Sequence, residues 1–170
     1  MFFVEPMTLE DAKTICTWRY EAPADIYNTE NSEEAWDSFM DELHFSVRDR
    51  ENGPLLGYIA FGPAATLAHP ELMHIYENEA YTDIALGLDP ARRGKGLGTE
   101  IFTLAMEMAG ESFPEDGFRV TVAADNEPAL RIYRKMGFEV ICDLQAEIIY
   151  PDFDEVERTC RKNIYVMVKG

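Results

Sequence analysis

The chain has 170 residues with a hydrophobic fraction of 46% and an aromatic fraction of 12%, which excludes a disordered acidic tail and predicts one domain over residues 1–170. Its 32 acidic and 15 basic side chains give a formal net charge of −17. This charge repels nucleic acids and anionic membranes, so we expect neither as a partner, and it favours cationic partners.

The first part of the chain shows clear signals for helix starts and for a hairpin turn. Thr8 followed by Asp11 resembles a capping box, and Ser32 is a typical residue before the first turn of a helix. Asn52-Gly53 is a strong turn signal between two apolar runs. The predicted elements are a strand (1–5), a helix beginning after Thr8, an irregular connection (20–31), a helix beginning after Ser32, and strands over 44–50 and 55–61.

A mixed segment over 63–79 leads to the second part, in which strands and helices alternate. The predicted elements are a strand (80–88), a long helix carrying Leu97, Ile101, Leu104, Ala105 and Met108 on one face, a strand (118–123), a short helix (126–136) and two closing strands (138–150 and 159–169). This order predicts an α+β domain, in which helices flank a mixed, mostly antiparallel sheet with a βαβ element at its centre.

Cysteine usage and the N-terminal residues bear on the compartment. Cys16, Cys142 and Cys160 are odd in number and widely spaced, so we expect neither a disulfide framework nor a metal site. The start MFFVEP lacks the basic and apolar regions of a signal peptide. We therefore expect a cytoplasmic protein. The closing hairpin offers a surface for a homodimer.

The most informative stretch joins the fourth predicted strand to the long helix. After Asp89-Pro90, three alternating glycines (Gly94, Gly96 and Gly98) lead directly into the helix. Glycine lets a ligand approach the backbone closely, and the first N–H groups of a helix have no intrahelical partner. Such a loop is suited to a phosphate or pyrophosphate, and Arg92, Arg93 and Lys95 add positive charge. The spacing fits neither the P-loop nor the dinucleotide fingerprint, because Gly96 follows Lys95 and Thr99 stands where the fingerprint needs glycine.

Two motifs follow one another in this part of the chain. The first is Arg93-Gly94-Lys95-Gly96-Leu97-Gly98, and the second is Asn126-Glu127-Pro128-Ala129-Leu130-Arg131-Ile132-Tyr133-Arg134-Lys135-Met136-Gly137-Phe138. They are similar to the [Q/R]xxGx[G/A] loop and the NxxAxxxYxxxGF segment of one family, and together they resemble the GNAT family of acyl-CoA-dependent N-acetyltransferases. The resemblance is dense between residues 82 and 138. It implies a GNAT fold, with acetyl-CoA as co-substrate.

The resemblance also assigns residues to the cofactor. The strands over 80–88 and 118–123 would splay apart to admit the pantetheine arm, whose amides would pair with the backbone of Leu86, Gly87 and Leu88. The pyrophosphate would lie on the amides of the loop, and Asn126 would hydrogen-bond the arm. The loop residues implied in cofactor binding are Arg93, Gly94, Lys95, Gly96, Leu97, Gly98 and Thr99.

Acetyl transfer to an amine implies two catalytic groups. Tyr133 would protonate the leaving thiolate of CoA as a general acid. Asp83 stands early in the fourth strand, where many relatives carry a catalytic glutamate, and would act as the base through a bridging water; Glu79 and Glu147 are the alternatives. Relatives that acetylate ribosomal protein N-termini carry a glutamate five residues before the motif asparagine, and this chain has Thr121 there.

Aromatic and acidic residues outside the two motifs bear on the acceptor. An aromatic and acidic connection, Trp18 to Tyr27, together with Glu71, Glu77 and Glu79, favours a cationic amine, either a small molecule or a peptide. The reaction would be a direct attack by a primary amine on acetyl-CoA in a ternary complex. The alternative is a non-catalytic acyl-CoA-binding sensor or protein-interaction module.

Overall fold

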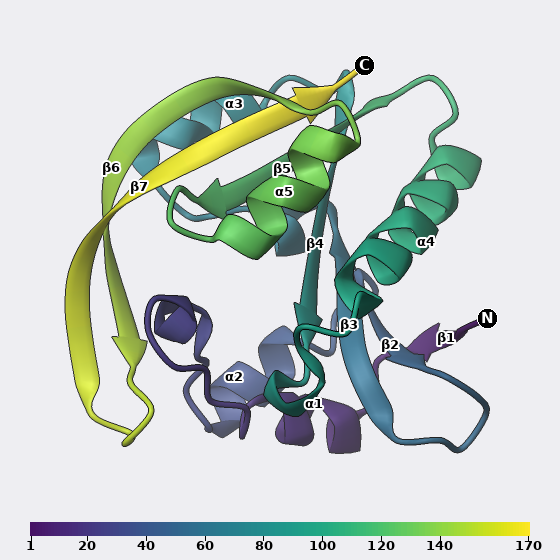
Figure 1. Ribbon diagram of the computed structural model, residues 1–170, viewed down its shortest axis with the longest axis vertical. Coiled ribbons are helices and arrows are strands. Elements are labelled where there is room, and N and C mark those ends of the chain that lie inside the picture. The colour runs from purple at the N-terminus through teal and green to yellow at the C-terminus, as the bar shows by residue number, and fades with distance from the viewer.

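The computed structural model describes residues 1–170, which form a curved seven-stranded sheet with helices on both faces (Figure 1). The strand order is β1-β2-β3-β4-β5-β7-β6. The strands are β1 (Phe3–Pro6), β2 (His44–Arg48), β3 (Leu55–Phe61), β4 (Tyr81–Leu88), β5 (Gly117–Ala123), β6 (Glu139–Pro151) and β7 (Glu157–Lys169). The helices are α1 (Leu9–Ile15), α2 (Glu33–Ser38), α3 (Met73–Tyr76), α4 (Leu97–Ser112) and α5 (Glu127–Lys135).

The predicted fold class is confirmed, and so are the local signals behind it. Only β4 and β5 pair in parallel, and all other neighbouring strands are antiparallel. The Thr8 hydroxyl accepts a hydrogen bond from the Asp11 amide at 3.1 Å, and the Ser32 hydroxyl accepts one from the Ala35 amide at 3.2 Å. Both caps satisfy N–H groups that the first turn of a helix leaves unpaired.

Helices α1 and α2 are shorter than the sequence predicts. Apolar residues at helical spacing continue to Trp18 and to Leu43, but the helices end at Ile15 and Ser38, because the chain after each turns away through tighter i to i+3 hydrogen bonds. The predicted element order left the order of the strands in the sheet open. In the structure β7 lies between β5 and β6, so the last strand of the chain is internal. The long β6–β7 hairpin curves around the side of the molecule next to β5 (Figure 1).

The sheet separates two hydrophobic clusters. The larger lies between the sheet and helices α4 and α5, and includes Ile84, Phe102, Val120 and Leu130, all of them buried. The smaller lies on the other face, where α1 packs. None of the helices combines the length and apolarity needed to cross a bilayer.

The centre of the sheet is where the fold creates space. Strands β4 and β5 pair through only three residue pairs, the last of which is Asp83 with Arg119. Beyond that rung β5 remains paired with β7 as far as Ala123, while β4 continues beside β3 to Leu88. One edge of β4 therefore has no strand partner over its second half, as the sequence resemblance implies.

Candidate active site

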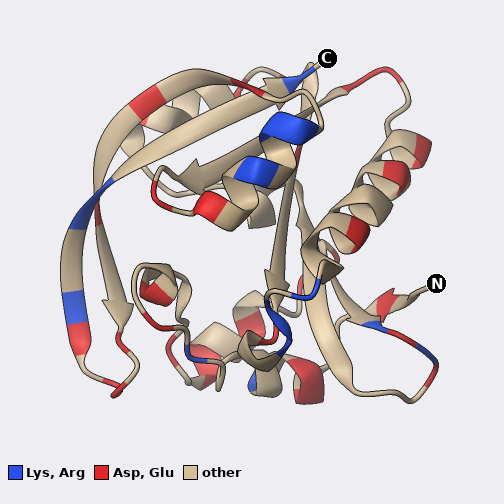
Figure 2. Ribbon diagram, in the orientation of Figure 1, with Lys and Arg blue, Asp and Glu red and all other residues tan.

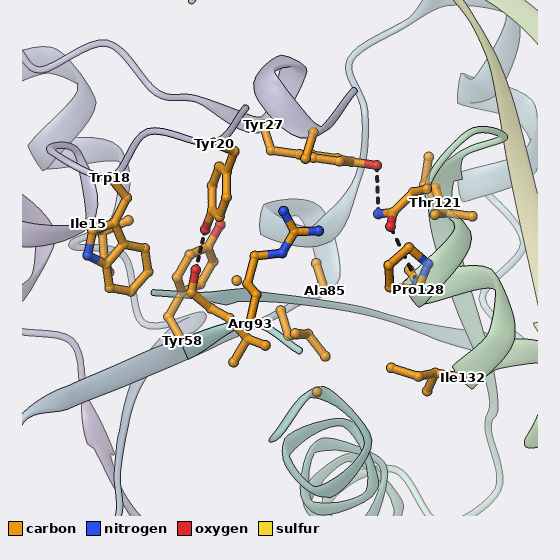
Figure 3. Close-up of a pocket in the computed structure, with 18 of the residues that line it drawn as sticks. Ile15, Trp18, Tyr20, Tyr27, Tyr58, Ala85, Arg93, Thr121, Pro128 and Ile132 are labelled. Atoms are coloured by element: carbon orange, nitrogen blue, oxygen red, sulfur yellow. Dashed lines mark hydrogen bonds between the residues drawn. The ribbon is translucent and has the colours of Figure 1, made fainter. Parts of the chain in front are cut away.

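A cavity of about 240 Å³ lies where β4 and β5 separate, and we call it the β4–β5 cleft (Figure 3). Its walls come from the second half of β4, the end of β5, the beginning of α5 and the connection between α1 and α2. Thirteen of its twenty lining residues are hydrophobic, as in most small-molecule sites. The lining includes Leu86, Gly87, Leu88, Arg93, Gly98, Asn126 and Tyr133, all of which the sequence predicts as site residues.

Two tyrosines of the α1–α2 connection reach opposite sides of the cleft (Figure 3). The Tyr20 hydroxyl donates a hydrogen bond to the carbonyl of Leu88 on β4. The Tyr27 hydroxyl accepts hydrogen bonds of 3.2 Å from the Ala123 amide of β5 and from the Asn126 side chain. Burial raises the pKa of both phenols, so both stay neutral around pH 7. The connection therefore spans the opening between the two strands.

The glycine loop leaves one end of the cleft with backbone donors. Gly94 and Gly96 have φ of +78° and +79°, which side chains with a Cβ rarely adopt. Gly96 precedes the first turn of α4, and no side chain caps that turn. None of the turn, loop and cap hydrogen bonds uses an amide of residues 94–99 as its donor. The loop thus presents N–H groups and the positive end of the α4 dipole to an anion.

Arg93 adds positive charge inside the cleft. Its side chain extends between Tyr20 and Ala85 (Figure 3), with the guanidinium carbon 5.4 Å from the centre of the Tyr20 ring. Lys95 is exposed on the loop. In the ribbon of Figure 2 the loop is a basic segment, and acidic positions are marked on α1, α2 and α4. The basic positions of α5 lie toward its C-terminal end.

Tyr133 lies at the inner wall of the cleft with an exposure of 7%. Its ring packs against Phe102, with ring centres 4.9 Å apart, and against Phe138, with ring centres 5.8 Å apart. The hydroxyl makes no hydrogen bond within the protein. Burial raises the pKa of this phenol, so it keeps its proton at neutral pH and is available as a donor.

Asp83 lies early in β4, as the sequence predicts, but it does not line the cleft. It is 6% exposed, and its two carboxylate oxygens each accept a hydrogen bond of 2.7 Å from Arg119. Arg119 also donates to the carbonyls of Ile75, Asn78 and Tyr76. Because the carboxylate is fully occupied by a buried guanidinium, we do not retain Asp83 as the general base. The ion pair instead fixes the last rung at which β4 and β5 are joined.

The alternative carboxylates also lie apart from the cleft. Glu79 and Glu147 do not line it, and neither do Glu71 and Glu77. Thr121 does line it, and its hydroxyl shares a 2.8 Å hydrogen bond with the Tyr76 hydroxyl. The cleft lining therefore lacks Glu71, Glu77 and Glu79, while the expected aromatic side chains Trp18, Tyr20 and Tyr27 are present. Glu21 of the same connection lines a groove beside the cleft.

Sequence reasoning missed several lining residues, among them Ile15, Thr29, Tyr58 and Ala85. Tyr58 lies opposite Gly87 in the β3–β4 pair. A Cβ on Gly87 would stand 2.2 Å from the Tyr58 ring, so the glycine makes room for the aromatic side chain. The sequence does carry a signal for Tyr58. It stands two positions before Ala60 on β3, so both side chains lie on the same face of the sheet.

Comparison with known proteins identifies the family of this chain. The sequence model of the Acetyltransferase (GNAT) family matches residues 11–138, which is more than half of the chain. The chain therefore belongs to the GNAT acetyltransferase family, whose members use acetyl-CoA as co-substrate.

Individual relatives are more distant. A mycothiol acetyltransferase from Mycolicibacterium smegmatis is 33% identical over 113 residues, which cover 65% of this chain and 34% of that protein. The chain thus spans about a third of the length of this relative. An acetyltransferase from Salmonella typhimurium, solved with acetyl-CoA, has a TM-score of 0.64 at 14% identity and covers 99% of this chain and 93% of its own. A spermidine/spermine N-acetyltransferase from Vibrio cholerae has a TM-score of 0.65 at 16% identity, with coverages of 99% and 91%.

Proposed function

We propose that this protein transfers the acetyl group of acetyl-CoA to a primary amine in the β4–β5 cleft. The observation that carries this proposal is that one cleft is lined by Arg93 and Gly98 of the glycine loop and by the Tyr133 phenol. The pyrophosphate would bind at the loop, and the pantetheine arm would follow Leu86 to Leu88 and displace the Tyr20 hydroxyl from the Leu88 carbonyl. The thioester would then lie near Tyr133.

The chemistry is a direct attack in a ternary complex. The free amine attacks the thioester carbonyl, so that a C–N bond forms and the C–S bond then breaks. A backbone N–H of β4 near Leu88 would stabilise the oxyanion. Tyr133 would donate its proton to the departing thiolate and regain one from the nitrogen of the new amide. The raised pKa of Tyr133 favours this role, because the phenol is protonated whenever the thiolate forms.

The acceptor is proposed to be cationic. The formal net charge of −17 attracts an ammonium group, and the aromatic side chains of the α1–α2 connection suit a cation. A suitable panel contains a thiol-bearing amine, spermidine and a short basic peptide, since the similar proteins include a mycothiol acetyltransferase and a spermidine/spermine N-acetyltransferase.

The test is turnover with this panel. Release of free CoA should depend on one class of amine, and mass spectrometry should detect that amine with one added acetyl group. Acetyl-CoA binding without transfer to any amine would contradict the proposal and favour a sensor.

Arg93 provides a prediction about the cofactor end of the cleft. Arg93→Glu should weaken acetyl-CoA binding about ten- to a hundredfold, because a charge-assisted hydrogen bond contributes about 1.5–3 kcal/mol. Isothermal titration calorimetry measures the change. Arg50→Glu is the matched control, since Arg50 is exposed on the β2–β3 turn and pairs only with Asp49. Equal affinities for both variants would show that Arg93 does not contact the cofactor.

A further inference from the structure

The β4–β5 cleft contains no side chain that can take a proton from an ammonium group near neutral pH. Its ionisable lining residues are four tyrosines and Arg93. Burial raises the pKa of all four phenols, that of Tyr58 to about 12. A protonated amine cannot attack a carbonyl, and lysine-type amines, with a pKa of about 10.4, are almost fully protonated at neutral pH. A side chain that takes this proton would therefore lie beside the cleft, where one adjoining groove includes Glu21 and Asp125 and another includes His44 and Asp41.

A second groove adjoins the cleft near the end of α2, and we call it the His44 groove. It has a volume of about 330 Å³ and shares Thr29, Tyr58 and Ala85 with the cleft. Its ionisable residues are His44, Asp41 and Tyr58. The remaining lining residues are Ser38, Phe39, Ala60 and Ala64.

The His44 side chain is held in a defined position. Its Nδ1 lies 2.7 Å from Oδ1 of Asp41, and that oxygen also accepts a 2.9 Å hydrogen bond from the Leu43 amide. The ring packs against Phe39, with ring centres 4.9 Å apart, and is 8% exposed. A carboxylate at Nδ1 assigns the proton of the neutral imidazole to that nitrogen. Nε2, which has no partner within the protein, then carries the free lone pair.

The sheet register connects this imidazole with the cleft. His44 pairs with Ala60 on β3, and Ala60 pairs with Ala85 on β4, so the three side chains form one row on the same face. Only the small side chains of Ala60 and Ala85, both of which line the groove, separate His44 from the free edge of β4. Neighbouring strands are about 4.8 Å apart, so the Cα atoms of His44 and Ala85 are separated by about 10 Å. An imidazole and one intervening water cover that span.

We infer that His44 is the general base for the acceptor amine, with Asp41 as its positioning residue; this inference rests on the proposed function. The acceptor enters through the His44 groove. Its ammonium gives one proton, across a water, to Nε2 of His44, and the imidazolium that forms is paired with Asp41. The neutral amine then attacks the thioester as described above, and His44 releases its proton to solvent after the products leave.

The test compares two acceptors that differ in their need for a base. For an amine of high pKa at pH 7, His44→Gln should lower kcat/KM about a hundredfold or more, in the range typical of general bases. For an otherwise similar amine that is largely unprotonated at pH 7, the loss should stay below about tenfold. The loss with the first amine should also shrink as the pH rises toward the pKa of that amine.

Controls separate a chemical role from a structural one. Asp41→Asn should show the same dependence on the acceptor with a smaller loss. His74→Gln, at an exposed histidine of α3 that lines neither cavity, should behave like the wild type. Stabilisation of the fold by acetyl-CoA should be the same in His44→Gln and in the wild type, which shows that the variant is folded.

Three results would overturn the inference. Unchanged rates in His44→Gln would show that His44 takes no proton. Equal losses with both amines at every pH would show that His44 only supports the structure. Absence of transfer to any amine by the wild type would refute the proposed function itself, and the base with it, which distinguishes that failure from the other two.

Discussion

Tyr133→Phe is expected to lower kcat by about 10² to 10⁴-fold, the range by which a positioned general acid accelerates a reaction. The affinity for acetyl-CoA should remain within about twofold, because the ring still fills its place between Phe102 and Phe138. Steady-state kinetics and calorimetric titration measure the two quantities separately. The prediction depends on the phenol being protonated, and burial ensures this by raising its pKa.

The control for Tyr133 is another tyrosine that lacks access to the cleft. Tyr165→Phe on β7 removes a hydroxyl that does not line the cavity, so kcat should not change. Equal kcat values for Tyr133→Phe and the wild type would mean that the thiolate leaves without help from Tyr133. A parallel loss of acetyl-CoA affinity would instead assign the phenol to cofactor binding.

Asp83→Ala is expected to reduce the free energy of unfolding by about 3–5 kcal/mol, because it leaves a buried guanidinium without its counter-charge. The side chains of Arg119 and Asp83 are only 2% and 8% exposed. Denaturant-induced unfolding measures the change. A loss below about 1 kcal/mol would show that the pair behaves like a solvent-exposed salt bridge.

A double variant separates the structural role of Asp83 from a catalytic one. Asp83→Leu combined with Arg119→Met removes both charges and should recover much of the stability lost by Asp83→Ala. We expect the folded double variant to retain acetyl transfer with a wild-type dependence on acceptor pKa. If the folded double variant lost acetyl transfer, Asp83 would again be a candidate for the general base.

Local signals in the sequence were sufficient to predict the fold class and the glycine loop that leads into α4. Caps such as Thr8, and the glycine loop before α4, act through neighbouring residues, so they can be read directly. The internal position of β7 could not be predicted in this way, because strand order depends on pairing between segments far apart in the chain. The same reason explains Asp83, whose partner Arg119 is 36 residues away.

His44 illustrates a second limit of sequence reasoning. It begins a strand that the sequence predicts correctly, but nothing in its neighbourhood distinguishes it from an ordinary core histidine. Its importance comes from the row that it forms with Ala60 and Ala85, which belong to two other strands. Only the strand register brings the imidazole and the edge of the cleft into one line.

The most direct test of this account is a thermal melt of the protein with and without acetyl-CoA. At a hundred times its Kd, a ligand that binds only the folded state stabilises it by about 2.7 kcal/mol, which corresponds to a rise in Tm of about 5–10 °C for a chain of this size. We predict that rise for the wild type and a smaller one for Arg93→Glu at the same concentration. No rise with acetyl-CoA or with longer acyl-CoA molecules would contradict the assignment of the β4–β5 cleft as the cofactor site.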